Sequence, residues 1–503
     1  MLRRSLIAGA ATVPFLRGGA RAARTPGVLR FGLSSYPPTL APWQNAGTAA
    51  GTVQLLMNRG LLSYAPDGSL QGELAESWGR DGNAWVFKLR EAQFHDGTPV
   101  RAEDVKWSME QVAGEKSTAY LRAQLQEAER IETPDARTVR LVMRTPNATI
   151  PFSLATFYMP VIKPGTTGAG GQPVGAGPFI LKAAERGVGL ELEANPKYYK
   201  PGMPKLRGIR ATAYADENLR VAALQAGDLD LIEYVPWQNM AAIEADPKLR
   251  LDATDGPYMY LVFNGKAGPF ADARVRRAVA HAIKREEIVR AAFFGRGKPL
   301  EGLPITPGTE FFDTERARAQ AYDPARAKAL LAEAGHPNGF STTLLSTAQY
   351  GMHKDTAEIV QQNLAAVGVQ VELKLPDWAT RVQLGNRGQY DFAVGGTASD
   401  SNDPDGMSAV LDGTLPPAYT RSINLPTPRV HDLLAAGRSE FDLVKRQAIY
   451  NEMQDAALEQ AGFVGLAWRS QGYAMSSDLR GFRNLPGSIG FFSGYTLEAA
   501  EFG

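Results

Sequence analysis

The side chains that could carry chemistry in this chain of 503 residues are carboxylates, a few histidines and loop aromatics, because there is no cysteine. A chain without thiols has no disulfides, zinc–thiolate sites, iron–sulfur clusters or cysteine nucleophiles. The five histidines show no metal-ligand spacing, and neither an H-E-x-x-H nor a G-x-S-x-G motif occurs. We therefore expect binding without catalysis, and no metal or cofactor. A secreted hydrolase is the alternative from another class, since counting does not exclude a glycosidase-like carboxylate pair.

Two loops occupy the position in which open α/β sheets bind ligands, just beyond the carboxyl end of a strand. One spans residues 395–404 and carries Thr397 and Asp400; the other spans residues 235–238 and carries Trp237. Because they come from different halves of the chain, the two loops predict a cleft between two lobes. Asp is also a favoured turn residue, so the capping of backbone N–H groups by Asp400 stays open as an alternative.

The second half of the chain shows the alternation of helices and strands that would position the first loop. Asp323-Pro324 is a helix start, with Asp as the N-cap and Pro at the first helical position. An amphipathic helix is predicted over 356–367, with strands over 369–373 and 390–394. This order predicts a largely parallel sheet wrapped by helices. In the first half, a strand is predicted over 28–33.

Residues 72–112 form the most specific pattern in the sequence: GELAESWGRDGNAWVFKLREAQFHDGTPVRAEDVKWSMEQV. The pattern predicts a short helical run around 74–78, and then a strand over 85–89 in which apolar and basic side chains alternate. A turn follows, and then a helix with an apolar stripe at Val105, Met109 and Val112. The aromatic residues of this stretch are expected in a core, not at a ligand.

This order of elements resembles the signature of the family 5 extracytoplasmic solute-binding proteins, the dipeptide, oligopeptide and nickel receptors of ABC importers. The family pattern runs LAxSW, a turn, W/YxFxLR, FHDGTPxTAEDV and a helix. Arg101 stands where the family has Ser or Thr as helix cap, so the cap is expected from Asp104 or the backbone. The family's PxxLDP is matched by residues 38–42 with Ala41 in place of Asp, and residues 175–179 match GTGPF with one change.

The resemblance implies an α/β fold of the two-lobed periplasmic-binding-protein type, class II and cluster C, with an extra subdomain in the first lobe. The expected divisions are a signal peptide over 1–22, lobe 1 over 23–264 with the subdomain at about 52–170, lobe 2 over 265–468, and a return to lobe 1 over 469–503. Closure of the lobes is expected about crossovers near Phe263 and Ala467.

The resemblance also implies a ligand. The loop 395–404 matches the family's GWxxDxxDP, in which the Asp grips the α-amino group of bound peptides; this carboxylate falls on Asp400, and Thr397 replaces the Trp. Asp403 is expected to have a structural role. Aromatic and histidine side chains near loops that the family turns toward its cleft suit peptides, sugars and cationic amines. They are Tyr36, Trp43, Trp237, Tyr350, His353 and Trp378. A di- or oligopeptide or peptide-like amine is the expected ligand; an oligosaccharide, a nickel complex or haem is the alternative.

Composition and the first residues predict the location of the protein. Residues 1–22 hold four arginines, no acid, a short apolar run and an A-x-A-like end, as in a cleavable twin-arginine or Sec signal. Without them the formal charge changes from +1 to −3, which gives no case for nucleic acid as a partner. We expect a periplasmic monomer that is not a lipoprotein and that delivers a small molecule to the transmembrane subunits of an ABC permease.

Overall fold

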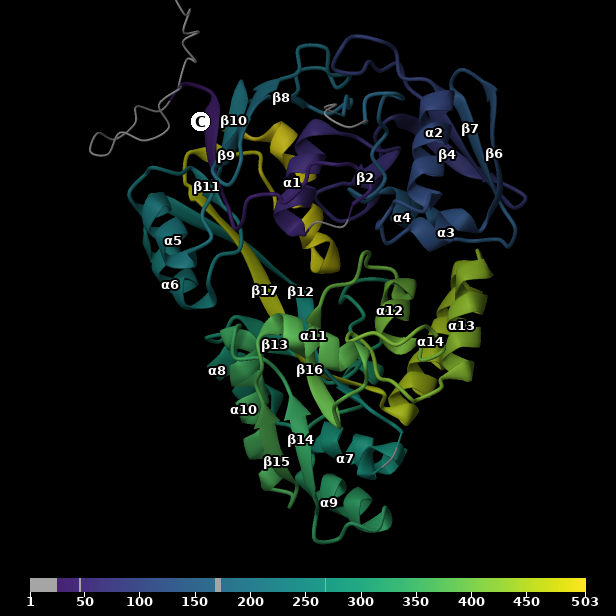
Figure 1. Ribbon diagram of the computed structural model, residues 1–503, viewed down its shortest axis with the longest axis vertical. Coiled ribbons are helices and arrows are strands. Elements are labelled where there is room, and N and C mark those ends of the chain that lie inside the picture. The colour runs from purple at the N-terminus through teal and green to yellow at the C-terminus, as the bar shows by residue number, and fades with distance from the viewer. Residues whose placement is uncertain (1–24, 45–46, 168–172, 267) are drawn as a thin grey trace, which may run out of the picture.

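The computed structural model describes residues 25–44, 47–167, 173–266 and 268–503, so the predicted signal at 1–22 lies outside the described residues. Figure 1 shows two lobes, with a large sheet running through both of them. None of the helices in the described ranges is long and apolar enough to cross a membrane.

The main sheet has eleven strands in the order β15-β14-β16-β12-β17-β11-β1-β10-β9-β8, with β13 beside β17. Its two longest strands, β12 (Leu249–Phe263) and β17 (Phe463–Ser476), pair antiparallel and run from the upper lobe into the lower lobe in Figure 1. The register between them shifts between Asp255 and Tyr258. Residues 249–255 pair only with the end of β17, whereas residues 258–263 also pair with β16 (Phe392–Thr397).

The upper lobe contains the strand predicted over 28–33, which is β1 (Val28–Leu33) and pairs parallel with both β10 and β11. The other elements here are β8 (Phe179–Glu185), β9 (Gly189–Ala194), β10 (Gly208–Ala213), β11 (Leu231–Ile232), α1 (Thr48–Met57), α5 (Glu217–Gln225), α6 (Trp237–Ala245) and the C-terminal 3-10 segment η4 (Gly487–Ala499). Helix α1 and η4 pack together although they lie at opposite ends of the chain, so the C-terminus returns to the upper lobe.

A separate antiparallel sheet, in the order β4-β5-β7-β6, lies beside the upper lobe in Figure 1. Its strands are β4 (Ala75–Asp81), β5 (Ala84–Leu89), β6 (Ala128–Asp135) and β7 (Thr138–Met143), and it is accompanied by β2 (Leu62–Tyr64), β3 (Leu70–Gly72), α2 (Ala102–Ala113), α3 (Arg122–Gln126) and α4 (Ile150–Leu154). The helical run predicted around 74–78 is wrong, because β4 begins at Ala75 and takes up the rest of this segment. Trp78 pairs with Phe87 across the β4–β5 hairpin, and this non-local pairing overrides the local helical pattern.

The helix predicted after the FHDGTP turn is confirmed as α2, and Val105, Met109 and Val112 are buried. Arg101 precedes the helix, and its backbone N–H donates to Asp104 Oδ2 at 2.8 Å. Asp104 therefore supplies the reciprocal half of a capping box, in which a side chain in the first turn accepts from the N–H of the residue before the helix.

The lower lobe is the helix-wrapped part of the sheet. Strand β14 (Ser341–Leu345) pairs parallel with β15 (Gln370–Lys374) and with β16, as the alternation predicted. Within the lower lobe the prediction of a largely parallel sheet is wrong beyond these three strands, because the neighbours β12 and β17 are the antiparallel crossings between the lobes. The remaining elements are α7 (Ala273–Ala282), α8 (Arg285–Ala292), β13 (Gly297–Pro299), α9 (Pro324–Glu333), α10 (Gly351–Ala365), α11 (Trp378–Asn386), α12 (Ser408–Leu411), α13 (Pro428–Ser439) and α14 (Leu443–Gln460).

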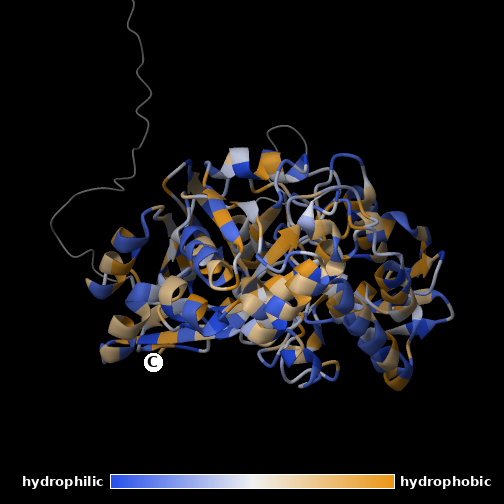
Figure 2. Ribbon diagram, turned by 90° about the horizontal axis from the view of Figure 1, so that it is seen from below, coloured by the Kyte–Doolittle hydropathy of each residue, from blue (hydrophilic) through white to orange (hydrophobic). Residues whose placement is uncertain are grey.

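Burial follows the pattern of the strands. In Figure 2 hydrophobic residues are frequent along the inner strands, and many residues of the surrounding helices and loops are hydrophilic. Residues 258–263 of β12 are fully buried because helices or loops cover both faces of the sheet there. Burial of this apolar surface is the main term that holds the crossing strands in place.

An ion-pair network ties the subdomain to the C-terminal segment. Glu73 is 1% exposed and pairs with Arg59 at 3.3 Å and with Lys200 at 2.7 Å. Glu498, from the end of η4, pairs with both of these cations. Burial alone would raise the pKa of Glu73, but Lys200 and Arg59 lower it to about 2.

Replacing Glu73 with Gln should lower the free energy of unfolding at pH 7 by about 2 kcal/mol, the scale of a hydrogen bond to a charged group. The folded pKa lies below the ordinary value of 4.5, so this stability is present above pH 4.5 and is lost as the pH falls toward 2. Denaturant unfolding between pH 2 and 7 measures it. A Glu73→Gln variant that loses as much stability on acidification as the wild type would contradict this role.

Candidate ligand-binding site

Two cavities lie between the lobes, and the side chains of Asp400, Tyr120 and Tyr158 line both of them. The smaller cavity, of about 180 Å³, is bounded by Thr48, Phe157, Phe491 and Phe492 of the upper lobe and by Thr397 to Asp400 of the lower lobe. The larger cavity, of about 340 Å³, extends from Asp400 between residues 120–158 and residues 400–438. Together they form a space of ligand size that both lobes enclose.

Asp400 follows the end of β16, at the position expected from the sequence. Its side chain is exposed to water inside the cavity, and it makes no hydrogen bond or ion pair with the residues that the structure describes. Residues of both lobes nevertheless line the cavities around it, and they displace part of the water that would otherwise solvate the carboxylate. This desolvation raises the pKa of Asp400 to about 7. A cation brought into the cavity would restore the charged form and pair with it.

The rest of the loop is held by buried charges. Asp403 accepts two hydrogen bonds from the guanidinium of Arg446, at 2.6 and 2.9 Å, and caps the short 3-10 turn that follows it. Asp405 accepts from Arg438 Nε at 2.8 Å. The amide of Asn402 bonds to the backbone of residues 486–488 in the upper lobe. Asp403 thus has the structural role expected of it. Asp405 lines the larger cavity but is paired with Arg438, so Asp400 is the carboxylate of this loop that faces a cavity without a partner among the described residues.

Tyr350, His353 and Trp378 come together in the lower lobe, with ring centroids 5.4 to 6.4 Å apart. Tyr419 stands edge-on to Trp378, and the guanidinium of Arg381 lies over both rings. His353 is 2% exposed, and its Nδ1 has no partner among the described residues. Burial, with the charges of Arg381 and Arg469, lowers the pKa of His353 to about 3, so the imidazole is neutral. A Cβ added to Gly396 would lie 3.3 Å from Nε2 of His353, which places this group beside Thr397.

None of the six aromatic and histidine residues expected at the cleft lines either cavity, and this includes the cluster of Tyr350, His353 and Trp378. The other three pack elsewhere. Trp43 packs in the core of the subdomain, edge-on to Trp107, because its flat apolar ring fills space there. Tyr36 packs against the core of the upper lobe. Trp237 stands edge-on to Phe293, and its Nε1 donates to Ser470 O at 2.7 Å, so it links α6 to the crossing strand.

Several cavity residues were not singled out from the sequence. They are Thr48, Tyr120, Phe157, Tyr158, Phe491 and Phe492. Most come from the subdomain and from η4, segments that reach the cleft only through packing between distant parts of the chain. The adjacent pair Phe491-Phe492 in a Gly-rich stretch is the one local signal that could have marked them.

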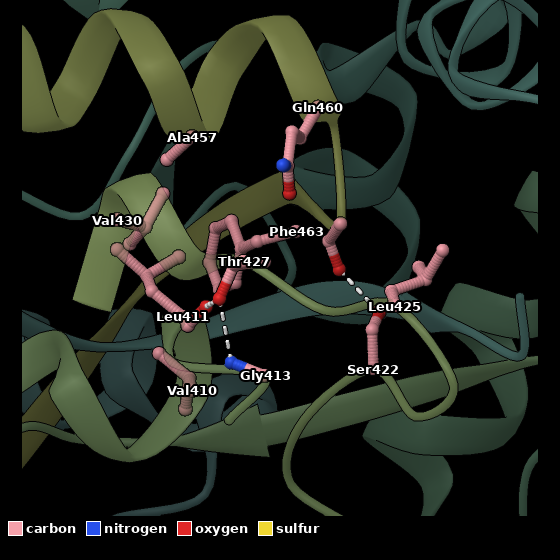
Figure 3. A pocket seen from close by; sticks show the side chains of 11 residues that line it. Val410, Leu411, Gly413, Ser422, Leu425, Thr427, Val430, Ala457, Gln460 and Phe463 are labelled. Carbon is pink, nitrogen blue, oxygen red and sulfur yellow. Dashed lines mark hydrogen bonds between the residues drawn. The ribbon is translucent and has the colours of Figure 1, made fainter. Parts of the chain in front are cut away.

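A third pocket, shown in Figure 3, lies inside the lower lobe and measures about 20 Å³. Mainly apolar side chains of residues 410–463 line it, and Thr427 Oγ1 accepts from the backbone of Gly413 at 2.8 Å. A volume near that of one water molecule makes it a packing void, not a ligand site. Within the described residues no three His, Asp or Glu side chains converge as a metal site would require.

Comparison with known proteins gives a consistent picture. The sequence profile of the bacterial extracellular solute-binding proteins, family 5 (middle region), matches residues 69–415. The chain is 28% identical over 503 residues to the glutathione-binding protein GsiB of Pectobacterium atrosepticum, with 97% of each chain covered. It is 27% identical to GsiB of Escherichia coli K12 over 479 residues, with 92% of each covered.

Solved structures extend this likeness. The periplasmic binding protein AgaA from A.tumefacien R10, in complex with agropinic acid, is 38% identical with a TM-score of 0.83, covering 95% of this chain and 99% of that one. DppA from Helicobacter pylori, in complex with the peptide STSA, has a TM-score of 0.79 at 21% identity, covering 95% and 98%. The second likeness concerns the fold alone.

Proposed function

This chain belongs to the bacterial extracellular solute-binding proteins of family 5, the substrate receptors of ABC importers, and we propose that its solute is a peptide-like amine held by Asp400. The observation that carries the proposal is an unpaired, desolvated carboxylate in a cavity enclosed by two lobes. Such a group is costly to ionise without a cation, and an ammonium group supplies one. The protein would deliver this solute to a permease.

The names of similar proteins support a peptide-like solute. GsiB of Pectobacterium atrosepticum, which is 28% identical to this chain, is described as glutathione-binding. AgaA was solved with agropinic acid, so a more similar protein holds a ligand of another kind. Thr397 stands where the family pattern has Trp. This difference is consistent with a ligand that is not an ordinary peptide.

We further propose that the lobes close by bending of β12 and β17. The register shift at Asp255–Tyr258 and the neighbouring residues Trp468 to Ser470 lie where the strands change partners between lobes. We also propose that the chain passes between the lobes at 264/265 and at 468/469. The mature protein would be a periplasmic monomer from which the signal peptide has been cleaved. The proposed function includes no chemical conversion of the solute, since members of the family are receptors.

Binding of an ammonium ligand should strengthen as the pH rises through about 7, because Asp400 must lose its proton to pair with the cation. With the pKa of Asp400 at about 7 and that of a peptide α-ammonium group at about 8, affinity at pH 8 should exceed that at pH 6 by roughly fivefold. Calorimetric titration with free dipeptides and with their N-acetylated forms tests both the pH profile and the need for the amine. Equal, pH-independent affinity for the two forms would indicate a ligand without a cation, such as an oligosaccharide.

A further inference from the structure

A pocket outside the cleft lies between the subdomain and the segment that follows β9. Its volume is about 610 Å³, larger than either cavity between the lobes, and it shares no lining residue with them. Residues 90–93, 99–101 and 136–137 of the subdomain and residues 197–199 of the upper lobe line it. A volume in this range suits a small organic ligand.

The lining of this pocket is strongly basic. It contains four cationic side chains and one carboxylate, namely Arg90, Arg101, Arg137, Lys197 and Glu91. The chain without its predicted signal has a formal charge of −3, so this positive excess is local. A concave surface lined by charges of one sign concentrates ions of the opposite sign.

Backbone hydrogen bonds bring the three arginines together although they are distant in the sequence. Arg90 directly follows β5, and the last N–H of that strand donates to the carbonyl oxygen of Arg137 at 2.7 Å. Arg101 directly precedes α2, and the first N–H of that helix donates to the carbonyl oxygen of Ala136 at 2.9 Å. The edge of the subdomain sheet therefore fixes the basic side of the pocket.

Arg90 has few good acceptors in the chain itself. Its Nε is buried without a hydrogen-bond partner among the described residues, and its Nη2 lies 3.4 Å from the carbonyl oxygens of Gly72 and Ala75, which is long for a hydrogen bond. The guanidinium lies 5.4 Å from the ring centre of Tyr199, whose hydroxyl donates to Glu73 of the ion-pair network. An anchored ring thus supports a guanidinium whose donors the chain leaves partly unused.

The other three cations are also open to a ligand. The side chains of Arg101 and Lys197 form no ion pair within the ranges that the structure describes. Arg137 donates from Nε to the carbonyl of Leu89 at 2.7 Å and pairs with Glu76 at 3.3 Å. Both side chains of this pair are about half exposed, and exposed pairs hold their members weakly.

Arg101 is the residue at which this chain departs from the family pattern, which has Ser or Thr there. A guanidinium has no acceptor and cannot cap a helix, and a cation is unfavourable near a helix N-terminus. The first turn of α2 offsets this charge with Glu103 and Asp104. The exposed Arg101 side chain therefore adds a cation to the pocket without serving the helix.

We propose that this pocket binds a small oxyanion of two or more negative charges, whose phosphate or carboxylate groups are held by Arg90, Arg101 and Lys197. Guanidinium groups match the geometry of both kinds of oxyanion. The rings of Tyr198 and Tyr199 offer a surface for an apolar part of the ligand. The site lies apart from the solute in the cleft and does not rest on the proposed function.

The test is calorimetric titration of the full mature chain with inorganic pyrophosphate at a fixed ionic strength of about 0.15 M. One equivalent should bind to the wild type. Arg101→Thr should weaken this binding about tenfold, the effect of one hydrogen bond to a charged group, and Lys197→Met should weaken it similarly. Since Thr is a favoured N-cap, Arg101→Thr should melt no lower than the wild type. Arg186→Thr is the matched control, because Arg186 is exposed in the turn between β8 and β9 and does not line the pocket.

Two sources offer this chemistry, a free organic phosphate or polycarboxylate and the headgroup of an anionic lipid. Flotation with phosphatidylglycerol vesicles distinguishes them. Flotation of the wild type but not of Arg101→Thr would support the pocket and identify a lipid headgroup. Absence of flotation in a protein that binds pyrophosphate would support the pocket and identify a free anion.

Three results would overturn the proposal. The first is a wild type that does not bind pyrophosphate. The second is an equal loss in Arg186→Thr, because the affinity would then come from overall charge. The third is a loss in Arg421→Met, which would place the anion in the larger cavity of the cleft, where Arg421 and Arg438 lie. Each of these results leaves the amine receptor with Asp400 intact, since its own test uses dipeptides.

Discussion

Asp400→Ala should weaken the binding of a dipeptide that the wild type retains by roughly 30- to several-thousand-fold at pH 8. The reason is that truncating one partner of a desolvated charge pair costs about 2–5 kcal/mol, much of it from the ammonium group left without a counter-charge. At about 1.4 kcal/mol per tenfold change, this range gives the expected loss. Calorimetric titration of the two proteins measures it.

Stability provides the control for this variant. The folded pKa of Asp400 is raised to about 7, so its stabilising contribution is present at low pH and is lost as the pH rises through 7. At pH 8 the substitution should therefore not lower the melting temperature of the ligand-free protein. Unchanged affinity in Asp400→Ala would show that the ligand carries no cation at this position, and a loss of stability would show that the carboxylate supports the loop.

Asp403→Ala should have the opposite effect and lower the free energy of unfolding by about 3–5 kcal/mol, the cost of breaking a buried ion pair by removing one partner. The side chains of Asp403 and Arg446 are 1% and 8% exposed, and the pair is bidentate. Its removal leaves the Arg446 guanidinium buried without its carboxylate. Denaturant unfolding at pH 7 measures the loss.

The two aspartates are three residues apart on one loop, so each is the matched control for the other. With the lower lobe still folded, Asp403→Ala should bind a dipeptide with an affinity near that of the wild type. A wild-type free energy of unfolding in Asp403→Ala would show that the loop does not depend on the pair. Should both variants lose affinity equally, the loop would act as a unit, and no separate role would belong to Asp400.

The sequence by itself determined the family, because residues 72–112, among them Trp85 and Phe87, match the order and spacing of a long family signature. The family profile confirms the assignment. Local signals also predicted β1 and the N-cap of α9, since strand alternation and Asp-Pro chemistry act over a few residues. The position of Asp400 just after a strand followed from the same kind of reasoning.

Only the tertiary structure decided what these residues face. Residues 75–78 became part of a strand because β5 pairs with them, and Trp43 entered a core because the subdomain folds around its ring. Nothing local in the sequence brings Arg90, Arg101 and Arg137 to one pocket; backbone hydrogen bonds from β5 and α2 to the turn between β6 and β7 place them there. Packing between distant segments determines such contacts. A sequence pattern with a period of a few residues does not predict them.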